Sequence, residues 1–229
     1  MTEGYIMGHA IITGTSSGIG QVLAQRLLEQ GWSVTGLARR DPDLGRRYRH
    51  ISVDLDDEEA LGAVLHDLPE SDALIHAAGL LRVGRHDGFN HDDGAQMWRL
   101  HVDVAARLIG AQVPKMRDGA RIVVIGSRVA GGAAGRGLYA ASKAALSGLV
   151  RSVAAELAPR GITVNIVAPG ATDTPMLRDP ARAAQRPKCP PIGRMVRPEE
   201  VAGTVAFLLS PDAGAITGQT IIICGGGSL

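Results

Sequence analysis

The segment Thr13–Gly20 reads TGTSSGIG and decides the fold class of the chain. Before it, Ala10–Thr13 is a short apolar run typical of a buried strand, and after it apolar residues recur at helical spacing over Ile19–Gln30. A glycine-rich turn between a strand and a helix brings helix-start N–H groups and the positive end of the helix dipole toward a phosphate. The pattern therefore predicts a dinucleotide site, with a turn that holds no ligand as the alternative.

Each glycine of the turn has an expected task. Gly14 allows the sharp turn at the end of the strand, and Gly18 lets a pyrophosphate approach the backbone. Gly20 lets the helix lie close to the sheet.

Short apolar runs alternate with longer helical patterns through the rest of the chain, which is typical of a doubly wound α/β fold. Strands this apolar are buried on both faces, so we expect a seven-stranded parallel sheet with helices on both faces. The prediction is a single-domain Rossmann fold over residues 1–229. Strands are expected at Ala10–Thr13, Ser33–Leu37, Ile51–Leu55, Ala73–Ala77, Arg121–Gly126, Thr163–Ala168 and Thr220–Ile223, and the later helices at Glu58–His66, Gly94–Met116, Leu138–Ala158 and Glu199–Leu209.

Composition excludes several classes of protein. The chain has 24 basic and 23 acidic residues, a balance that argues against a nucleic-acid footprint and against disorder. We expect Cys189 and Cys224 to be free thiols, since they are far apart and lack metal-ligand spacing. Without a signal segment or a long apolar stretch, the expectation is a cytoplasmic protein with no membrane partner.

Three residues indicate acid–base catalysis. Tyr139 and Lys143 are four positions apart, so one helix face presents a phenol beside an ammonium group that favours the phenolate. Ser127 ends a predicted strand, where parallel sheets place their ligands. A tuned tyrosine can then exchange a proton with a carbonyl or alcohol oxygen that the serine holds.

The glycine turn, Ser127, Tyr139 and Lys143 together resemble the short-chain dehydrogenases/reductases, whose members carry TGxxxGIG at this place. The resemblance runs from Ala10 to Gly226. It is to the classical branch of the family, because the larger C-terminal substrate region of the extended branch has no counterpart in this sequence. It implies Tyr139 as the acid/base, Lys143 as the residue that tunes it and holds the ribose, and Ser127 as the residue that positions the substrate oxygen.

The resemblance also shows where this chain departs from the family. His101 stands where relatives carry an active-site asparagine, and we expect it to hold a water beside Lys143 and to add a low-pH limit to activity. A helix-surface histidine unconnected with catalysis is the alternative. His76 replaces one of the asparagines of a family motif, whereas Ala77 and Gly79 keep its small residues.

Cofactor choice is predicted from the end of the second strand. Ala38 stands where NAD-type relatives place an aspartate, and Arg39 and Arg40 follow, so the sequence favours NADP(H) and leaves NAD(H) open. Asp54 resembles the aspartate that binds the adenine ring, and Thr172 and Thr174 lie in a segment resembling the family's nicotinamide-binding loop. The full expected cofactor set is Gly14, Ser16, Ser17, Gly18, Ile19, Gly20, Arg39, Arg40, Asp54, Leu55, Ala77, Ala78, Gly79, Tyr139, Lys143, Pro169, Gly170, Thr172 and Thr174.

Two loops interrupt the alternation. Residues 172–198 correspond to the family's substrate lid and carry a net positive charge, for which a solvated loop is the first explanation and an acidic substrate or acyl-carrier partner the second. Residues 86–93 contain histidines and aspartates without a metal-binding spacing, so we expect no metal.

The sequence therefore predicts an oxidoreductase that transfers a hydride between NADP(H) and a small carbonyl or secondary alcohol substrate. Relatives assemble through their two long helices, so a homodimer or homotetramer is expected. One alternative is an enzyme resembling 3-oxoacyl-(acyl-carrier-protein) reductase, and another is a nucleotide-binding regulatory protein without turnover.

Overall fold

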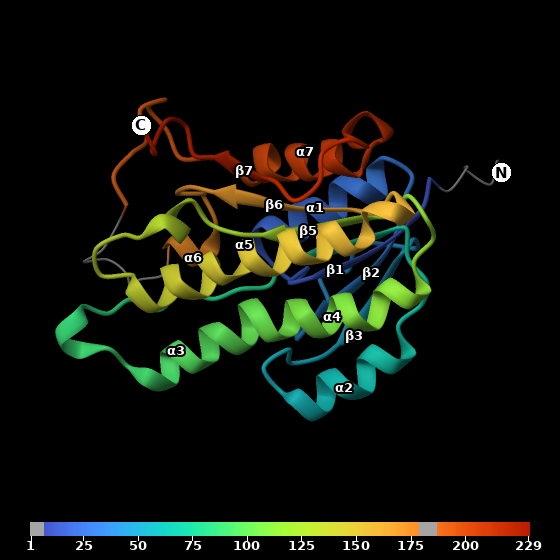
Figure 1. Ribbon diagram of the computed structural model, residues 1–229, viewed down its shortest axis with the longest axis horizontal. Coiled ribbons are helices and arrows are strands. Elements are labelled where there is room, and N and C mark those ends of the chain that lie inside the picture. Colours follow the sequence, from blue (N-terminus) through green and yellow to red (C-terminus); the bar gives the residue numbers. More distant parts are fainter. Residues whose placement is uncertain (1–6, 179–186) are drawn as a thin grey trace.

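The computed structural model describes residues 7–178 and 187–229 and contains a seven-stranded, all-parallel sheet (Figure 1). The strand order is β3-β2-β1-β4-β5-β6-β7, which reverses direction between β1 and β4. This order is that of the Rossmann fold, so the predicted fold class is confirmed. The strands are β1 (His9–Thr13), β2 (Ser33–Ala38), β3 (Tyr48–Ser52), β4 (Ala73–His76), β5 (Arg121–Ile125), β6 (Thr163–Pro169) and β7 (Thr220–Ile223).

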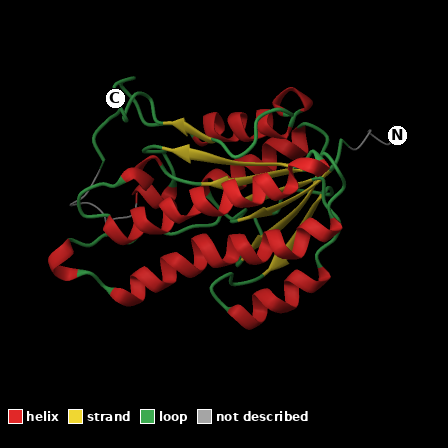
Figure 2. Ribbon diagram, viewed as in Figure 1, coloured by secondary structure: helices red, strands yellow, loops and turns green. Residues whose placement is uncertain are grey.

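Helices cover both faces of this sheet (Figure 2). Helices α1 and α7 pack against each other on one face, and α2, α4 and α5 lie on the other (Figure 1). The bounds of the helices are α1 (Gly18–Glu29), α2 (Glu58–Asp67), α3 (His91–Trp98), α4 (Val104–Gln112), α5 (Gly137–Leu157), α6 (Pro175–Arg178) and α7 (Pro198–Leu209).

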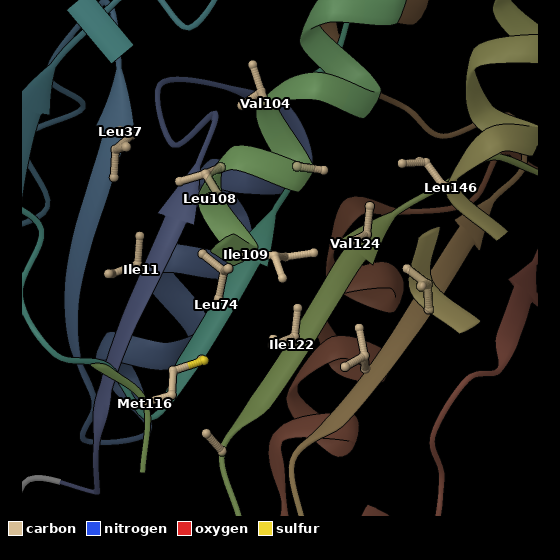
Figure 3. Packing of buried hydrophobic residues seen from close by; sticks show 14 of the residues in the cluster. Ile11, Leu37, Leu74, Val104, Leu108, Ile109, Met116, Ile122, Val124 and Leu146 are labelled. Carbon is tan, nitrogen blue, oxygen red and sulfur yellow. The ribbon is translucent and has the colours of Figure 1, made fainter. Parts of the chain in front are cut away.

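Alternating strand residues build two cores. Ile11 and Leu74 belong to the same core as Leu108 of α4 and Leu146 of α5 (Figure 3). The next strand residues, such as Ile12, belong to the core beneath α1 and α7. Because the central strands are buried on both faces, a functional site is expected near the carboxyl ends of the strands.

The third strand lies earlier than predicted. It covers Tyr48–Ser52 and not Ile51–Leu55, because Tyr48 is paired with Val34 and Ser52 with Ala38. The apolar residues that follow leave the sheet while remaining buried. This shift places Asp54 in the loop beyond the strand end.

The predicted helix Gly94–Met116 is interrupted. It begins earlier, at His91, because the Asn90 side chain accepts hydrogen bonds from two backbone N–H groups of the first turn. A π-helical segment, Arg99–Asp103, then separates α3 from α4. Such bulges free backbone carbonyls and are common at functional sites.

Within the described ranges, no helix has both the length and the apolar character needed to cross a membrane.

Candidate active site

The glycine turn after β1 is shaped by close backbone approaches. Gly14 has φ +75°, and a Cβ atom there would lie 2.9 Å from the Cα of Ala78. A Cβ on Gly20 would overlap the Gly14 carbonyl, so the start of α1 sits directly against the turn. A side chain at either position would collide with the backbone, which explains why both residues are glycine.

The hydroxyl of Thr13 joins β1 to the end of β4. It accepts hydrogen bonds from the backbone N–H groups of Ala77 and Ala78, each at 3.0 Å. Its own proton is directed to Nδ1 of His76, also at 3.0 Å. These bonds fix the turn on which Gly79 lies.

His76, at the end of β4, links three parts of the structure. Nε2 of His76 lies 3.0 Å from the Leu100 carbonyl in the π-helical segment, so Nε2 donates and Nδ1 accepts from Thr13. Burial and the nearby Lys143 ammonium lower the pKa of His76 to about 3. The neutral ring thus connects β1, β4 and the bulge between α3 and α4.

A cavity of about 430 Å³ opens beside the glycine turn, between the ends of β1, β2 and β4. It adjoins a second cavity of about 140 Å³ that contains the predicted catalytic residues, and Gly79 and Thr174 line both. All predicted cofactor residues line one of these two cavities except Arg40, which the structure places outside both. The first cavity is lined by Gly14, Ser16, Ser17, Gly18, Ile19, Gly20, Arg39, Asp54, Leu55, Ala77, Ala78, Gly79 and Thr174, and the second by Ile19, Ala77, Gly79, Tyr139, Lys143, Pro169, Gly170, Thr172 and Thr174.

Arg39 and Asp54 face each other across the outer end of the first cavity. Nη1 of Arg39 lies 4.0 Å from Oδ2 of Asp54, and both side chains are more than half exposed. An exposed pair at this distance stabilises the fold little, so the guanidinium is available to an anion. Ala38, just before Arg39, supplies no carboxylate to the same rim.

The second cavity brings together the four predicted catalytic residues. Ser127 begins a 3-10 turn after β5, Tyr139 and Lys143 come from the first turns of α5, and His101 comes from the π-helical segment. The rings of His101 and Tyr139 meet edge to face with centroids 5.6 Å apart. The structure thus gathers these side chains at the carboxyl end of β5, while their roles stay predictions.

Lys143 is buried beneath this cavity. Its Nζ donates a hydrogen bond of 2.9 Å to the Ile125 carbonyl, and burial lowers the pKa of Lys143 to about 7. A Cβ atom on Gly79 would lie 3.6 Å from Nζ, so this glycine leaves the ammonium accessible from the cavity.

The structure speaks against the water that was expected beside His101. Nε2 of His101 accepts a hydrogen bond from the Leu80 backbone N–H, and Nδ1 lies 2.9 Å from the Ser142 hydroxyl. Both ring nitrogens therefore have protein partners and are not free to hold a water. Burial, the Lys143 ammonium and His76 hold the pKa of His101 far below its usual range, so the ring stays neutral.

The expected substrate lid is only partly described, because residues 179–186, which include Arg182 and Arg186, lie outside the described residues. In the described part, α6 forms at Pro175–Arg178, and Thr172 bridges to Val196. Two arginines of this part of the loop form ion pairs with acidic neighbours: Arg178 lies 2.8 Å from Asp173, and Arg194 lies 2.7 Å from Glu200.

The two cysteines and the residues that could bind a metal lie as follows. Cys189 and Cys224 are free thiols, as predicted, and the structure shows the first exposed and the second buried. Among residues 7–178 and 187–229 no group of three or more His, Cys, Asp or Glu side chains is arranged to hold a metal.

Sequence reasoning missed four residues of the site. Thr13 and Ser142 act through hydrogen bonds that only the fold reveals, although Ser142 directly precedes Lys143. Arg128 and Arg136 line the catalytic cavity. Arg128 directly follows Ser127, and Arg136 lies three positions before Tyr139. This closeness in sequence to the predicted catalytic residues could have indicated that both arginines belong to the site.

Comparison with known proteins agrees with this geometry. The family model described as enoyl-(acyl carrier protein) reductase matches residues 14–228. The chain belongs to the short-chain dehydrogenase/reductase family. It is 35% identical to the 3-oxoacyl-[acyl-carrier-protein] reductase of Vibrio cholerae over 235 residues, which cover 95% of this chain and 96% of that relative.

Solved structures of this family superpose closely on the chain. A short-chain dehydrogenase family protein from Francisella tularensis has a TM-score of 0.90 and 27% identity, covering 97% of this chain and 99% of that one. BdcA in complex with NADPH has a TM-score of 0.86 and 32% identity, covering 97% and 95%. The protein is thus a short-chain oxidoreductase acting on CH–OH or carbonyl groups, of a family that uses NAD(P)(H).

Proposed function

We propose that the protein transfers a hydride between NADP(H) and a carbonyl or secondary alcohol, and that it works as a reductase of a ketone or an aldehyde. The observation that carries the proposal is the junction of the two cavities. The cavity at the glycine turn shares Gly79 and Thr174 with the cavity that contains Ser127 and Tyr139, so the two lie side by side. A nucleotide bound along the first would end where the second begins.

The residues present fit such a nucleotide. The turn at Gly14–Gly20 forms a cradle at the start of α1, where backbone N–H groups suit phosphate oxygens. Gly18 has φ +57°, and a Cβ atom there would lie 3.5 Å from the side chain of Thr174, a residue that lines both cavities. A side chain at Gly18 would thus narrow the site where a nucleotide is expected.

When bound, the nicotinamide ring supplies or accepts the hydride at its C4 atom. In the reductive direction, the hydroxyl of Tyr139 donates its proton to the substrate oxygen while the Ser127 hydroxyl donates a hydrogen bond to the same oxygen. Lys143, held by the Ile125 carbonyl, favours the resulting phenolate through its positive charge. In the oxidative direction, the phenolate of Tyr139 accepts the proton of the alcohol.

The preference for the 2′-phosphate rests on Arg39. It lines the first cavity beyond the end of β2, where Ala38 replaces the carboxylate that would bind a ribose hydroxyl. A guanidinium pairs well with a phosphate. The related protein solved with NADPH adds support.

The test is calorimetric titration of NADPH and of NADH into the full chain and into Arg39→Ala. We expect NADPH to bind at least about tenfold more tightly than NADH, and Arg39→Ala to remove most of that difference. Arg46→Ala, an exposed arginine of the same loop that lines neither cavity, is the matched control. Equal affinities in the unmodified protein would overturn the cofactor preference.

Turnover on a panel of ketones and aldehydes tests the rest of the proposal. Tyr139→Phe should lower kcat by about a hundredfold or more while NADPH still binds. Binding of NADPH without turnover of any carbonyl would instead support a regulatory protein.

A second candidate is the reduction of a 3-oxoacyl group on an acyl carrier protein. It is favoured by the 35% identity to the Vibrio cholerae reductase over nearly the whole of both chains. Comparison of kcat/KM for an acetoacetyl carrier-protein thioester and for free ketones separates the two candidates. A preference for the thioester of more than about a hundredfold, or about 2.7 kcal/mol, would replace the first proposal by the second.

A further inference from the structure

A third cavity adjoins the catalytic one and shares no lining residue with the cavity at the glycine turn. It has a volume of about 740 Å³ and shares Arg128, Arg136, Ala171 and Pro187 with the catalytic cavity. Its lining contains no aspartate or glutamate among the described residues. Its basic residues are Arg85, Arg128, Arg136 and Lys188.

Arg128 and Arg136 differ from the other arginines of this region. Arg85 pairs with Asp87, and Arg178 and Arg194 pair with acidic neighbours at 2.7–2.8 Å, so their charges are neutralised within the protein. Neither Arg128 nor Arg136 forms an ion pair with any described residue. Both side chains are half-buried, so each guanidinium is partly shielded from water while it borders the cavity.

The bonding of the two arginines leaves room for a ligand. Nη1 of Arg128 donates a 2.8 Å hydrogen bond to the Gly227 carbonyl, which anchors the side chain and leaves the other N–H groups of the fork available. For Arg136, the structure records bonds of the backbone only: its N–H donates to Ala133, and its carbonyl accepts from Ala140. The carboxyl end of the chain does not neutralise them, because no ion pair joins the Leu229 carboxylate to either guanidinium within the described ranges.

Both arginines are tied to the reacting residues by the chain. Arg128 directly follows Ser127, and Arg136 is the residue that precedes α5, three positions before Tyr139. A substrate whose oxygen lies between Ser127 and Tyr139 therefore extends toward two uncompensated positive charges. Guanidinium groups bind carboxylates with paired, parallel hydrogen bonds.

We propose that the substrate is a carbonyl compound that also carries a carboxylate, and that Arg128 and Arg136 bind this carboxylate while Ser127 and Tyr139 hold the carbonyl oxygen. This inference rests on the proposed reductase function and names its substrate class. The carboxylate of the substrate would thus lie in the third cavity, beside Arg128 and Arg136. It would not bind the arginines described in the 172–198 loop, because most of them already form ion pairs with acidic residues.

The test compares matched acids and esters as substrates with NADPH. Acetoacetate, levulinate and the oxo acid one carbon longer are each measured against their methyl esters, which keep the ketone and remove the charge. We expect kcat/KM to favour the acid over the ester for at least one chain length by about tenfold or more. In Arg128→Met and Arg136→Met this acid-to-ester ratio should fall by about tenfold, mainly through the KM of the acid.

Two further variants sharpen the result. Arg136→Lys keeps the charge but not the fork and should retain part of the preference. Arg117→Met removes the same charge at the opposite end of the sheet, where Arg117 lies 3.9 Å from Asp72, and should leave the ratio unchanged. Equal use of acid and ester at every length, or an undiminished preference in both methionine variants, would overturn the proposal.

If neither acids nor esters are reduced, calorimetry keeps the two proposals distinguishable. Levulinate and methyl levulinate are titrated into the NADPH-loaded full chain and into its Arg136→Met variant. Selective binding of levulinate that is lost in the variant supports the anion site even though the reductase function fails. Binding of neither, or of both alike, overturns the anion site.

Discussion

Nδ1 of His101 lies 2.9 Å from Oγ of Ser142, and this contact ties the bulge between α3 and α4 to the helix that carries Tyr139 and Lys143. Because Nε2 accepts from the Leu80 backbone, Nδ1 must donate to Ser142. The Ser142 hydroxyl in turn donates to the Tyr139 carbonyl at 2.8 Å. His101 is thus a positioning residue that orients α5 through a neutral ring.

The first prediction concerns the pH dependence of catalysis. His101→Asn should leave the acidic limb of the kcat/KM profile where it is, because the neutral ring has no proton to gain in the working range. An asparagine can also accept from Leu80 and donate to Ser142, whereas leucine can do neither. His101→Leu should therefore lower kcat at all pH values, by about tenfold if two buried polar partners are left unpaired.

Steady-state rates from pH 5 to pH 9 for the unmodified protein and both variants check this prediction. Movement of the acidic limb by more than about half a pH unit in His101→Asn would show that the histidine titrates after all.

The second prediction concerns acid stability and follows from His76. Its pKa is about 3 in the folded protein and 6.5 in an unfolded chain, so between these values only the unfolded state binds the proton. The free energy of unfolding therefore falls with decreasing pH by up to about 1.4 kcal/mol per pH unit from this residue. His76→Asn should make the pH dependence below 6.5 shallower by about that amount.

Urea unfolding at pH 5, 6 and 7 measures the slope. The unmodified protein and His76→Asn are measured side by side at each pH. An unaltered slope in His76→Asn would mean that His76 is not kept neutral by the fold.

Much of this architecture was predictable from the sequence, for reasons that are local. The TGTSSGIG turn requires glycine at Gly14 and Gly20, because a side chain there would collide with the backbone. Strands such as β5 and β6 consist of apolar residues buried on both faces, which indicates a parallel sheet covered by helices. The shared location of Ser127 and Tyr139 was also predictable, since strand ends and helix faces follow from the spacing of residues.

What could not be predicted depends on contacts between distant segments. The third strand was displaced because its register is set by pairing with β2 and not by its own apolar residues. The π-helical segment follows no local sequence signal, yet it supplies the Leu100 carbonyl to His76 and sets the position of His101. Arg128 and Arg136 were missed because ion pairing is a property of the fold and not of a local charge count.

The third prediction concerns Cys224, the residue that directly follows β7. Burial opposes ionisation of this thiol, but bonds from the Ser228 hydroxyl and from backbone N–H groups of residues 226–228 outweigh it, so the pKa of Cys224 is lowered. These donors suit an anionic acceptor. Cys224→Asp should therefore be tolerated, whereas Cys224→Val leaves the donors unpaired and should lower the free energy of unfolding by about 1–3 kcal/mol.

Thermal and urea unfolding of the two variants side by side checks this, with Cys189→Val as the control for an exposed thiol. Greater damage from aspartate than from valine would contradict the prediction.

The last prediction concerns the cost of keeping Lys143 buried. Its pKa falls from 10.5 to about 7 on folding, so between these values a smaller fraction of the lysine is charged in the folded state than in the unfolded state. The unfolded state therefore binds the extra proton, and stability rises with pH across this window. Below pH 7 the full penalty is present, roughly 5 kcal/mol at about 1.4 kcal/mol per factor of ten in the ionisation equilibrium.

Replacing the ammonium by an apolar group should remove this penalty, although the Ile125 carbonyl then loses its partner at a cost of about 1–3 kcal/mol. Lys143→Met should thus be more stable than the unmodified protein by about 2 kcal/mol near pH 6, and the gain should shrink toward pH 10. The same variant should lose turnover, because the charge beside Tyr139 is gone. Urea unfolding at pH 6, 8 and 10 decides the matter, and a gain in stability that does not depend on pH would show that packing, and not the buried charge, is responsible.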